Sequence, residues 1–429
     1  MSGPAVVARR EAGALRRHRD FNLLWGGESV SELGSQVSML ALPIVAVRSL
    51  GATAFEVGVL TALSTASFLL VGLPAGAIVD RLARRPVMIL ADAVRLAALA
   101  SVPLAYLAGA LVLAQLYAVA FVVGLLTVFF DVAYQSYLPS LVGTAHLVEG
   151  NAKLAGTAQV AQVAGPSLAG GLVQVIGGAL AVSVDAASYG VSALAVTLIG
   201  SREPAPVRVG DRRLWREVGE GLRFVFGHPV LRAVAATTAT ANLFGSMIVA
   251  VEVVFLVRVV HVSPGVIGLL FAAGGVGGVL GAVAAGRISA WIGASRATIA
   301  GILVTSGALL LPLTTRGAGE AFFAGGLFLF GLGSVVYNVN QVSFRQRLCP
   351  PRLLGRMNAT MRFVVWGVMP IGALAGGGIA TALGLRPTLW LGAAGSTLSV
   401  VWLLCSPLRS TRDFPAEEAW EMERQASPL

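Results

Sequence analysis

Three polar side chains recur every four residues in the first long apolar stretch of the chain: Glu28, Glu32 and Gln36. Residues four apart lie on the same face of an α-helix, so this spacing predicts one polar face on an otherwise apolar helix. Glu32 lies near the middle of the stretch, where a charge surrounded by lipid costs about 2.5 to 3.5 kcal/mol. A carboxyl group that faces a cavity there can bind a proton from one side of a membrane and release it to the other. We predict that Glu32 couples proton movement or contacts substrate, with Glu28 and Gln36 beside it; a neutral, hydrogen-bonded structural Glu32 is the alternative.

Other polar side chains interrupt later apolar stretches. We expect further cavity groups at Asn242, Glu252, Asn338 and Gln341. Asp92 and Arg95 lie three residues apart, so we expect them to neutralise each other on one helix. Asp185 and Glu252 are expected toward the outer ends of their helices, close to water.

The scaffold for these side chains follows from composition. Of 429 residues, 56% are hydrophobic and only 12% are charged, whereas about a quarter of the residues of a soluble domain carry charge. Apolar runs of about 20 residues succeed each other with short polar spacers, the length of a transmembrane helix. Backbone polar groups in lipid must be bonded within the segment, so runs of this length predict an all-α, polytopic membrane protein and exclude a β-barrel.

Charges, prolines and glycines mark the ends of twelve expected spans. They lie near residues 22–47, 57–79, 87–108, 114–137, 154–176, 179–200, 230–256, 265–285, 297–313, 321–343, 358–382 and 388–405. With this set, 25 of the 31 Lys and Arg residues fall on the side of the N-terminus, and only four fall in opposite loops. Cytoplasmic loops carry such an excess, so both termini are expected in the cytoplasm. One lysine against thirty arginines is typical of a high-GC genome, which fits a bacterial plasma membrane.

The order of the spans predicts two similar halves. At an offset of 207 residues, Leu147, Gly165 and Gly170-Gly171 match Leu354, Gly372 and Gly377-Gly378. We expect a six-helix half over residues 1–200, a cytoplasmic linker over 201–228, a second half over 229–408 and a cytoplasmic tail over 409–429. Apolar residues of 212–226 share one face, so the linker should contain an amphipathic helix on the membrane surface. Repeated halves around a midplane cavity are typical of secondary transporters.

One loop carries a recognisable motif. The run Gly76-Ala-Ile-Val-Asp80-Arg81-Leu-Ala83-Arg84-Arg85 resembles the G-x-x-x-D-R-x-G-R-R loop of the major facilitator superfamily, with Ala83 in place of the second glycine. The resemblance implies a latch in which Asp80 accepts hydrogen bonds at the start of the eleventh helix, near Asn358, and Asp131 pairs with Arg84 or Arg81. Simple anchoring of these arginines to lipid headgroups is the alternative. The latch residues are Gly76, Asp80, Arg81, Arg84, Arg85 and Asp131.

A second motif lies in the fifth span. Gly165-Pro166-Ser-Leu-Ala-Gly170-Gly171 is similar to the core of the antiporter motif of this superfamily, although Ala161 stands where a further glycine is usual. Glycine and proline permit a bend and close helix contact, which can seal one side of a cavity. Generic packing of small residues is the alternative.

The openings of the first and seventh spans, residues 16–25 and 221–232, and residues 130–139 resemble the enterobactin-exporter and macrolide-efflux branch of this superfamily. The resemblance implies proton-coupled export of a drug, siderophore or other secondary metabolite. An uptake symporter or lipid carrier of the same fold, and a transport-dead sensor or scaffold, are the alternatives. The expected partners are a small-molecule substrate, protons and the lipid bilayer, and the expected state is a monomer.

Several function classes are not expected. Neither G-x-x-x-x-G-K-[ST] nor H-E-x-x-H occurs, so we expect no nucleotide-driven pump, no metal, no other cofactor and no enzyme. The pI near 10.7 arises from short interhelical loops rather than from a basic soluble module, so nucleic acid is not an expected partner. Two cysteines, Cys349 and Cys405, predict no disulfide framework.

Overall fold

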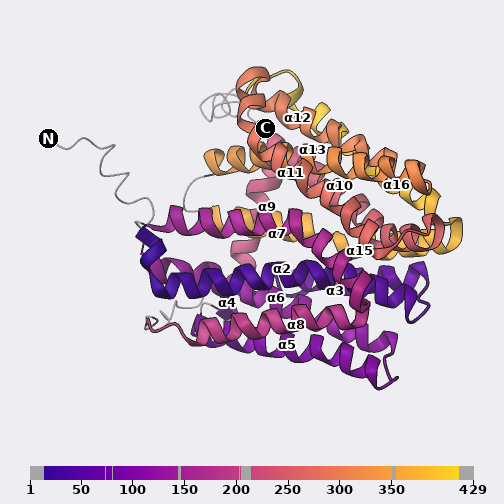
Figure 1. Cartoon of the computed structure of the whole chain (residues 1–429). Helices are drawn as coiled ribbons and strands as arrows, with labels where there is room; N and C mark the ends of the chain where they lie inside the picture. The colour runs from indigo at the N-terminus through magenta and orange to yellow at the C-terminus, as the bar shows by residue number, and fades with distance from the viewer. Residues whose placement is uncertain are drawn as a thin grey trace. The chain divides into compact units, whose positions relative to one another are not determined.

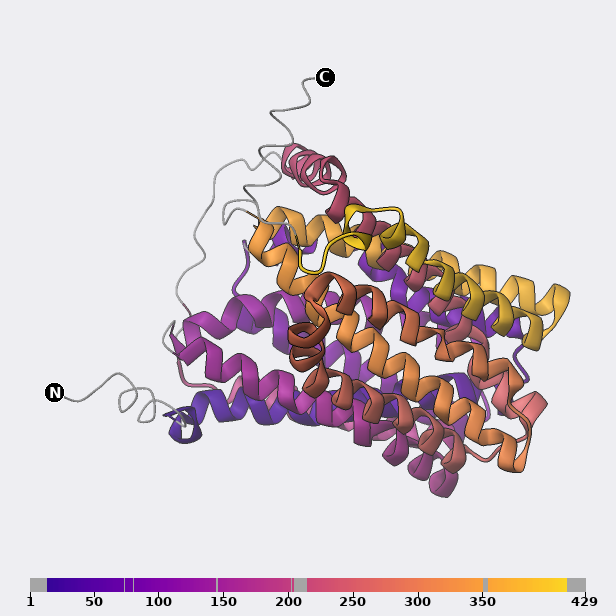
Figure 2. The same ribbon diagram turned by 90° about the horizontal axis from the view of Figure 1, so that it is seen from above.

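The computed structural model describes residues 14–72, 74–79, 81–143, 146–201, 203, 214–349 and 354–414, and over these ranges it is helical with no β-strand. The fold forms two compact units. The first contains residues 1–210 and 253–272, and the second contains residues 211–252 and 273–429. Within each unit the long helices run side by side (Figures 1 and 2).

The first unit is built from long apolar helices. They are α2 (Arg19–Arg48), α3 (Ala54–Val71), α4 (Pro74–Val79), α5 (Arg84–Leu107), α6 (Leu113–Val142), α7 (Leu147–Ile176) and α8 (Gly178–Thr197). Helix α8 packs on both α2 and α5, α7 packs on α2, and α6 packs on α3 and α5. The predicted span over 57–79 is therefore two helices, because Pro74 has no amide hydrogen to continue the ladder of α3.

The second unit has the same kind of helices with more interruptions. They are α9 (Leu214–Gly227), α10 (Pro229–Phe255) with a π-helical end (Leu256–Val260), α11 (Pro264–Ile292), α12 (Ala294–Val304) continued by the 3₁₀ helix η4 (Thr305–Leu313), α13 (Glu320–Leu348), α14 (Leu354–Trp366), α15 (Met369–Leu383), α16 (Leu385–Leu398) and α17 (Val400–Leu404). The predicted span over 358–382 is also broken, just before Pro370. By the unit boundaries above, the C-terminal end of α10 and the N-terminal end of α11 belong to the first unit.

Eleven helical segments of the described chain are long and apolar enough to cross a membrane. Helix α7 is long enough, with 30 residues, but glutamines and glycines make it less apolar than those eleven. Helices also extend past several predicted ends, as in α11, because polar residues at a bilayer surface continue a helix without entering lipid.

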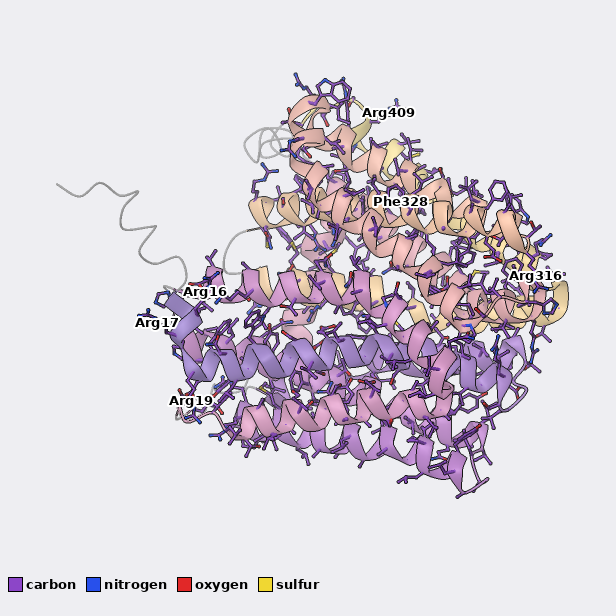
Figure 3. The ribbon with its side chains drawn as sticks, viewed as in Figure 1. Arg16, Arg17, Arg19, Arg316, Phe328 and Arg409 are labelled. Atoms are coloured by element: carbon purple, nitrogen blue, oxygen red, sulfur yellow. The ribbon has the colours of Figure 1, made fainter. Side chains whose placement is uncertain are left out.

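In the first unit Arg16, Arg17 and Arg19 gather at one end of α2, and in the second Arg316 and Arg409 lie at opposite ends (Figure 3).

The boundaries of several helices repeat along the chain. Helices α7 and α14 begin 207 residues apart, at Leu147 and Leu354, and the glycines that follow α7 and α15, Gly177 and Gly384, differ by the same offset. Both glycines have positive φ, 83° and 96°, which only glycine adopts without strain. The repeat predicted from sequence therefore corresponds to equivalent helix ends.

The linker helix α9 packs on α14. Arg356 forms an ion pair with Glu220, and a Cβ atom at Gly221 would lie 2.8 Å from the carbonyl oxygen of Arg356. Val225 is fully buried. The described side chains of the amphipathic helix thus contact α14 through one face. The side chains of residues 212–218 lie outside the described part of the structure.

Candidate functional site

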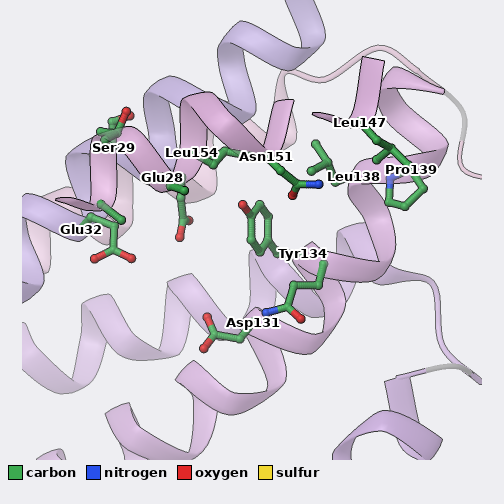
Figure 4. A pocket seen from close by; sticks show the side chains of 14 residues that line it. Glu28, Ser29, Glu32, Asp131, Tyr134, Leu138, Pro139, Leu147, Asn151 and Leu154 are labelled. Atoms are coloured by element: carbon green, nitrogen blue, oxygen red, sulfur yellow. The ribbon is translucent and has the colours of Figure 1, made fainter. Parts of the chain in front are cut away.

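A cavity of about 610 Å³ lies within the first unit, between α2, α6 and α7. Glu28 and Glu32 enter it from α2, and Asp131 and Tyr134 enter it from α6 (Figure 4). The side chains of Asn151, Thr157 and other α7 residues complete the wall. The predicted four-residue spacing therefore places two carboxylates in one cavity, where a third joins them.

Hydrogen bonds hold the helices around this cavity. The indole Nε1 of Trp25 donates to Oγ1 of Thr157 at 2.8 Å, which ties α2 to α7. The Ser29 hydroxyl donates to the Trp25 carbonyl oxygen at 2.6 Å and stays on its own helix. Because Trp25, Ser29 and Glu32 follow each other at three- and four-residue spacing, the same helix face supplies both the attachment and the acidic groups.

The cavity wall is acidic. Among the described residues that line it, none is Lys or Arg. Lys153 lies nearby on α7, but its Nζ pairs with Glu149 at 3.4 Å and lies over the rings of Phe21 and Trp25. Oxygen Oε2 of Glu28 is buried and has no hydrogen-bond partner among the described residues. A buried carboxyl oxygen without a donor can accept a proton or a cationic group of a bound molecule.

A buried ion pair lies close to the acidic cavity. Arg95 is bonded to Asp92 on α5, as predicted, and its Nη1 donates to Oγ1 of Thr127 at 3.3 Å. The guanidinium carbon lies 4.6 Å from the ring centre of Phe130 and 4.2 Å from that of Tyr189. Aromatic faces attract a cation most strongly where water is excluded, so the rings help to keep this charge inside the bundle.

Two carboxyl groups were expected near water, and the structure corrects this. Asp185 is 1% exposed and accepts a hydrogen bond from the Ser188 hydroxyl at 3.2 Å, and Glu252 is 7% exposed. A Cβ atom on Gly34 of α2 would meet the Ser188 side chain first and then Oδ1 of Asp185, at 2.9 Å, so both residues pack in the space beside this glycine. Distance along a helix placed both near an end, but helix packing covers them.

Gln36 contacts the glycine motif of α7 rather than the cavity. A Cβ atom on Gly165 would lie 2.5 Å from the Cβ of Gln36. Gly170 is packed against the start of α11, where a Cβ atom would lie 2.5 Å from the carbonyl oxygen of Pro264. Pro166 lies inside α7, and a Cβ atom on Gly171 would meet no described atom within 4 Å. Gly165 and Gly170 are thus required for close helix contact.

The remaining predicted cavity groups belong to the second unit and not to this cavity. Asn242 of α10 donates to the carbonyl oxygen of Val365 at 2.9 Å, which joins α10 to α14. Gln341 is buried and donates to the side-chain oxygen of Asn338, its neighbour on α13, at 2.8 Å. Asn338 itself is exposed. Asn242 therefore joins two helices, whereas the bond between Gln341 and Asn338 stays on α13, and Glu252 is the acidic member of this set.

The latch stays a prediction, and the structure shows where its described members lie. Asp80 lies outside the described residues, Gly76 lies in α4, and Arg81 is exposed. Arg84 or Arg81 was expected to pair with Asp131. Nη1 of Arg84 lies 3.3 Å from Glu203, and Asp131 lines the cavity. Glu203 also accepts hydrogen bonds from the backbone amides of Arg84 and Arg85, at 2.8 and 3.2 Å. A carboxylate at a helix start is favourable there, and it comes from the segment after α8.

Comparisons with known proteins agree with this architecture. The model of the Major Facilitator Superfamily matches residues 24–369 and 234–428. The chain belongs to the Major Facilitator Superfamily. As a member of this superfamily it is a multi-pass membrane transporter and not an enzyme.

Among curated proteins of the superfamily, the chain is similar to the multidrug efflux pump Tap of Mycolicibacterium fortuitum, with 27% identity over 83% of this chain and 88% of the relative. The pump of the same name from Mycobacterium tuberculosis strain H37Rv is also 27% identical, over 83% and 85% of the two chains.

Solved structures share the fold. The nucleoside transporter NupG has a TM-score of 0.73 at 9% identity, covering 90% of this chain and 98% of that one. A bacterial homologue of the iron transporter ferroportin in an inward-facing state has a TM-score of 0.72 at 17% identity, with the same coverages.

Three residues of the site were not predicted from the sequence. Tyr134 and Asn151 line the cavity, but an aromatic or an amide in an apolar helix is usually a packing residue. Glu203 lies in a polar linker segment where charges are ordinary. The sequence does contain a signal for Glu203, because the pair Arg202-Glu203 recurs as Arg412-Asp413 after the last span.

Proposed function

We propose that this transporter is a proton-coupled exporter that moves a bulky small molecule out of a bacterial cell by alternating access. In this proposal twelve spans form two six-helix halves, both termini are cytoplasmic, and the protein acts as a monomer in the plasma membrane. The observation that carries it is the meeting of Glu28, Glu32 and Asp131 in one cavity. The name of the Tap relatives, multidrug efflux pumps, supports export.

The chemistry of the cavity suits exchange. Two carboxylates one helical turn apart on α2, facing a third on α6, repel each other when all are charged. Either protons or a cationic or polar substrate relieves this repulsion, so the two compete for the same oxygens. Proton entry can therefore displace the substrate, and this competition is the coupling that antiport requires.

The test is transport in proteoliposomes with an imposed pH gradient and a panel of hydrophobic cationic dyes. We expect dye movement against its gradient, with protons moving in the opposite direction; dye and protons moving together would indicate symport instead. Absence of dye-dependent proton flux across the panel would favour the scaffold alternative.

Glu32→Gln is expected to abolish gradient-driven transport while equilibrium dye binding persists, because the amide fills the same space but carries no titratable proton. Glu320→Gln is the matched control, since Glu320 lies outside the cavity and accepts a hydrogen bond from the Gly317 amide. Gradient-driven transport that continues unchanged in Glu32→Gln would refute the assignment of this residue.

A further inference from the structure

The turns that follow α2 and α10 have the same construction. Gly51 and His261, 210 residues apart, both have positive φ, at 69° and 60°. The next residue in each turn, Ala52 or Val262, donates its amide hydrogen six residues back, to Ala46 at 2.8 Å or to Leu256 at 3.1 Å. In both turns this bond spans one residue more than the bond that usually closes a helix end at a left-handed residue, so both helices end in the same wider motif.

An arginine precedes each turn, and each arginine bonds to the other turn. Arg48 donates from Nη2 to the carbonyl oxygen of Val262 at 3.1 Å. Arg258 donates from Nη2 to the carbonyl oxygens of Gly51, at 3.0 Å, and Ala52, at 2.6 Å. Arg48 and Arg258 are 210 residues apart, as are Ala52 and Val262. The two interactions are therefore reciprocal, and we call these residues the arginine clasp.

Both sides of the clasp lie in the first compact unit, because residues 253–272 pack with it. Close helix contact supports them. A Cβ atom on Gly268 of α11 would lie 2.9 Å from the Cα of Gly170 of α7, so neither position has room for a larger side chain. The clasp and the glycine contact thus hold the outer ends of α10 and α11 together with α2 and α7.

His261 adds independent evidence that the geometry of the turn matters. It is the one residue of the described chain other than glycine with positive φ, a conformation that costs about 1 kcal/mol or more for a side chain with Cβ. The strain persists because the turn must present the Val262 carbonyl to Arg48. Such strain concentrates in segments that switch between arrangements.

The chemistry of the clasp permits opening. Both guanidinium groups are exposed, whereas Ala52 and Val262 are buried. The acceptors are neutral carbonyl oxygens, so separation leaves no buried charge without a partner, and water replaces each bond. A buried ion pair in this place would be far harder to break.

We propose that Arg48 and Arg258 are gating residues that hold the outer side of the transporter closed, and that both bonds break when substrate is released outward. This inference deepens the alternating-access function proposed above. It predicts that removing the two arginines favours the outward-open state even without substrate or a pH gradient.

The experiment measures the distance between spin labels at Ser49→Cys and Val259→Cys, two exposed positions beside the arginines, in a Cys349→Ser/Cys405→Ser background. In Arg48→Met/Arg258→Met the longer-distance population should rise about tenfold or more relative to the short one, since hydrogen bonds to charged groups are being lost. Arg48→Lys/Arg258→Lys retains a donor at each site and should give an intermediate population.

Two controls make the outcome decisive. Arg386→Met removes another arginine-to-carbonyl bond, to Thr314 at 3.0 Å within the second unit, and should leave the distances unchanged. Gly268→Leu forces the glycine contact apart and should lengthen them, which shows that the labels report opening. If Gly268→Leu shifts the labels and the arginine variants do not, the clasp is refuted. A shift in a protein that shows no proton-coupled transport would retain the clasp and reject the proposed function.

Discussion

Arg95 is a positive charge enclosed by a helical bundle, with 3% of its surface exposed. Its neighbours are an acid on its own helix, a threonine on α6 and two aromatic rings. Nitrogen Nε of the guanidinium has no hydrogen-bond partner among the described residues. The rings and Asp92 together compensate for the water that this group loses.

This arrangement predicts the effect of removing one partner. Arg95→Met leaves Asp92 buried without its counter-charge, which typically costs about 3 to 5 kcal/mol. We expect a much lower midpoint of thermal unfolding in detergent, measured by tryptophan fluorescence. Asp92→Asn/Arg95→Met removes both charges and should recover most of the loss. A double variant no more stable than Arg95→Met would contradict the pairing.

Residue patterns predicted that Glu28 and Glu32 share one helix face, but not what surrounds them. Glu28 and Glu32 were found because a four-residue spacing defines a helix face whatever the tertiary structure. Asp131, which the motif assigns to the latch, also lines the cavity, because its neighbours there come from α2, far away in the sequence. Contacts between segments that are distant in the sequence depend on how the helices pack. The sequence of one chain does not reveal that packing directly.

At the scale of elements, two helix starts are capped from a distance. Neither Ala83 before α5 nor Gly293 before α12 supplies a side-chain cap. Glu203 accepts from the amides of Arg84 and Arg85, and Asp413 accepts from the amide of Ala294 at 2.9 Å. Each acid follows the last span of its own unit, and the two caps differ by 210 residues at both ends.

Loss of either cap should loosen only its own helix. A side-chain cap is worth about 1 kcal/mol, which corresponds to roughly fivefold faster opening of the first turn. We expect Glu203→Ala to speed hydrogen exchange in a peptide covering residues 84–90, and Asp413→Ala to do so in residues 294–300. Each variant is the control for the other. Equal acceleration of both peptides in one variant would show a general loosening instead.

The ends of helices were predictable where a single residue, such as a glycine, marks the end. Apolar run length placed the spans, and Gly177 and Gly384 marked helix ends at the expected offset. The breaks before Pro74 and Met369, and the change from α12 to η4, were not anticipated. An apolar run of adequate length reads as one span, whereas a break inside it depends on how neighbouring helices satisfy the freed backbone groups.

On the scale of the whole molecule, the reactivity of the two cysteines can test how the chain is oriented in the membrane. Cys405 is exposed and Cys349 is buried just after α13, where burial raises the pKa of its thiol. Thiolate is the reactive form, so at neutral pH maleimide should modify Cys405 first. The rate at Cys349 should increase as the pH rises toward its pKa. Mass spectrometry of the alkylated peptides measures both rates.

The same reaction tests the predicted topology. In a Cys349→Ser protein, a membrane-impermeant maleimide should label Cys405 in inside-out vesicles and not in right-side-out vesicles. Labelling only from the outer side would reverse the orientation. Cys405→Ser is the matched control for background.

The position and length of the 3₁₀ helix η4 can be explained by comparing the two copies of the repeat. Helix starts match at an offset of 210 up to α12 and at 207 from α13 onward, so the stretch from the start of α12 to the start of α13 is three residues shorter than the stretch from α5 to α6. Three residues of α-helix are about 4.5 Å long. A 3₁₀ helix rises about 0.5 Å more per residue than an α-helix, so the nine residues of η4 regain about the same length. The 3₁₀ backbone thus compensates in length for the three missing residues, and restoring three residues there should allow η4 to relax into an α-helix.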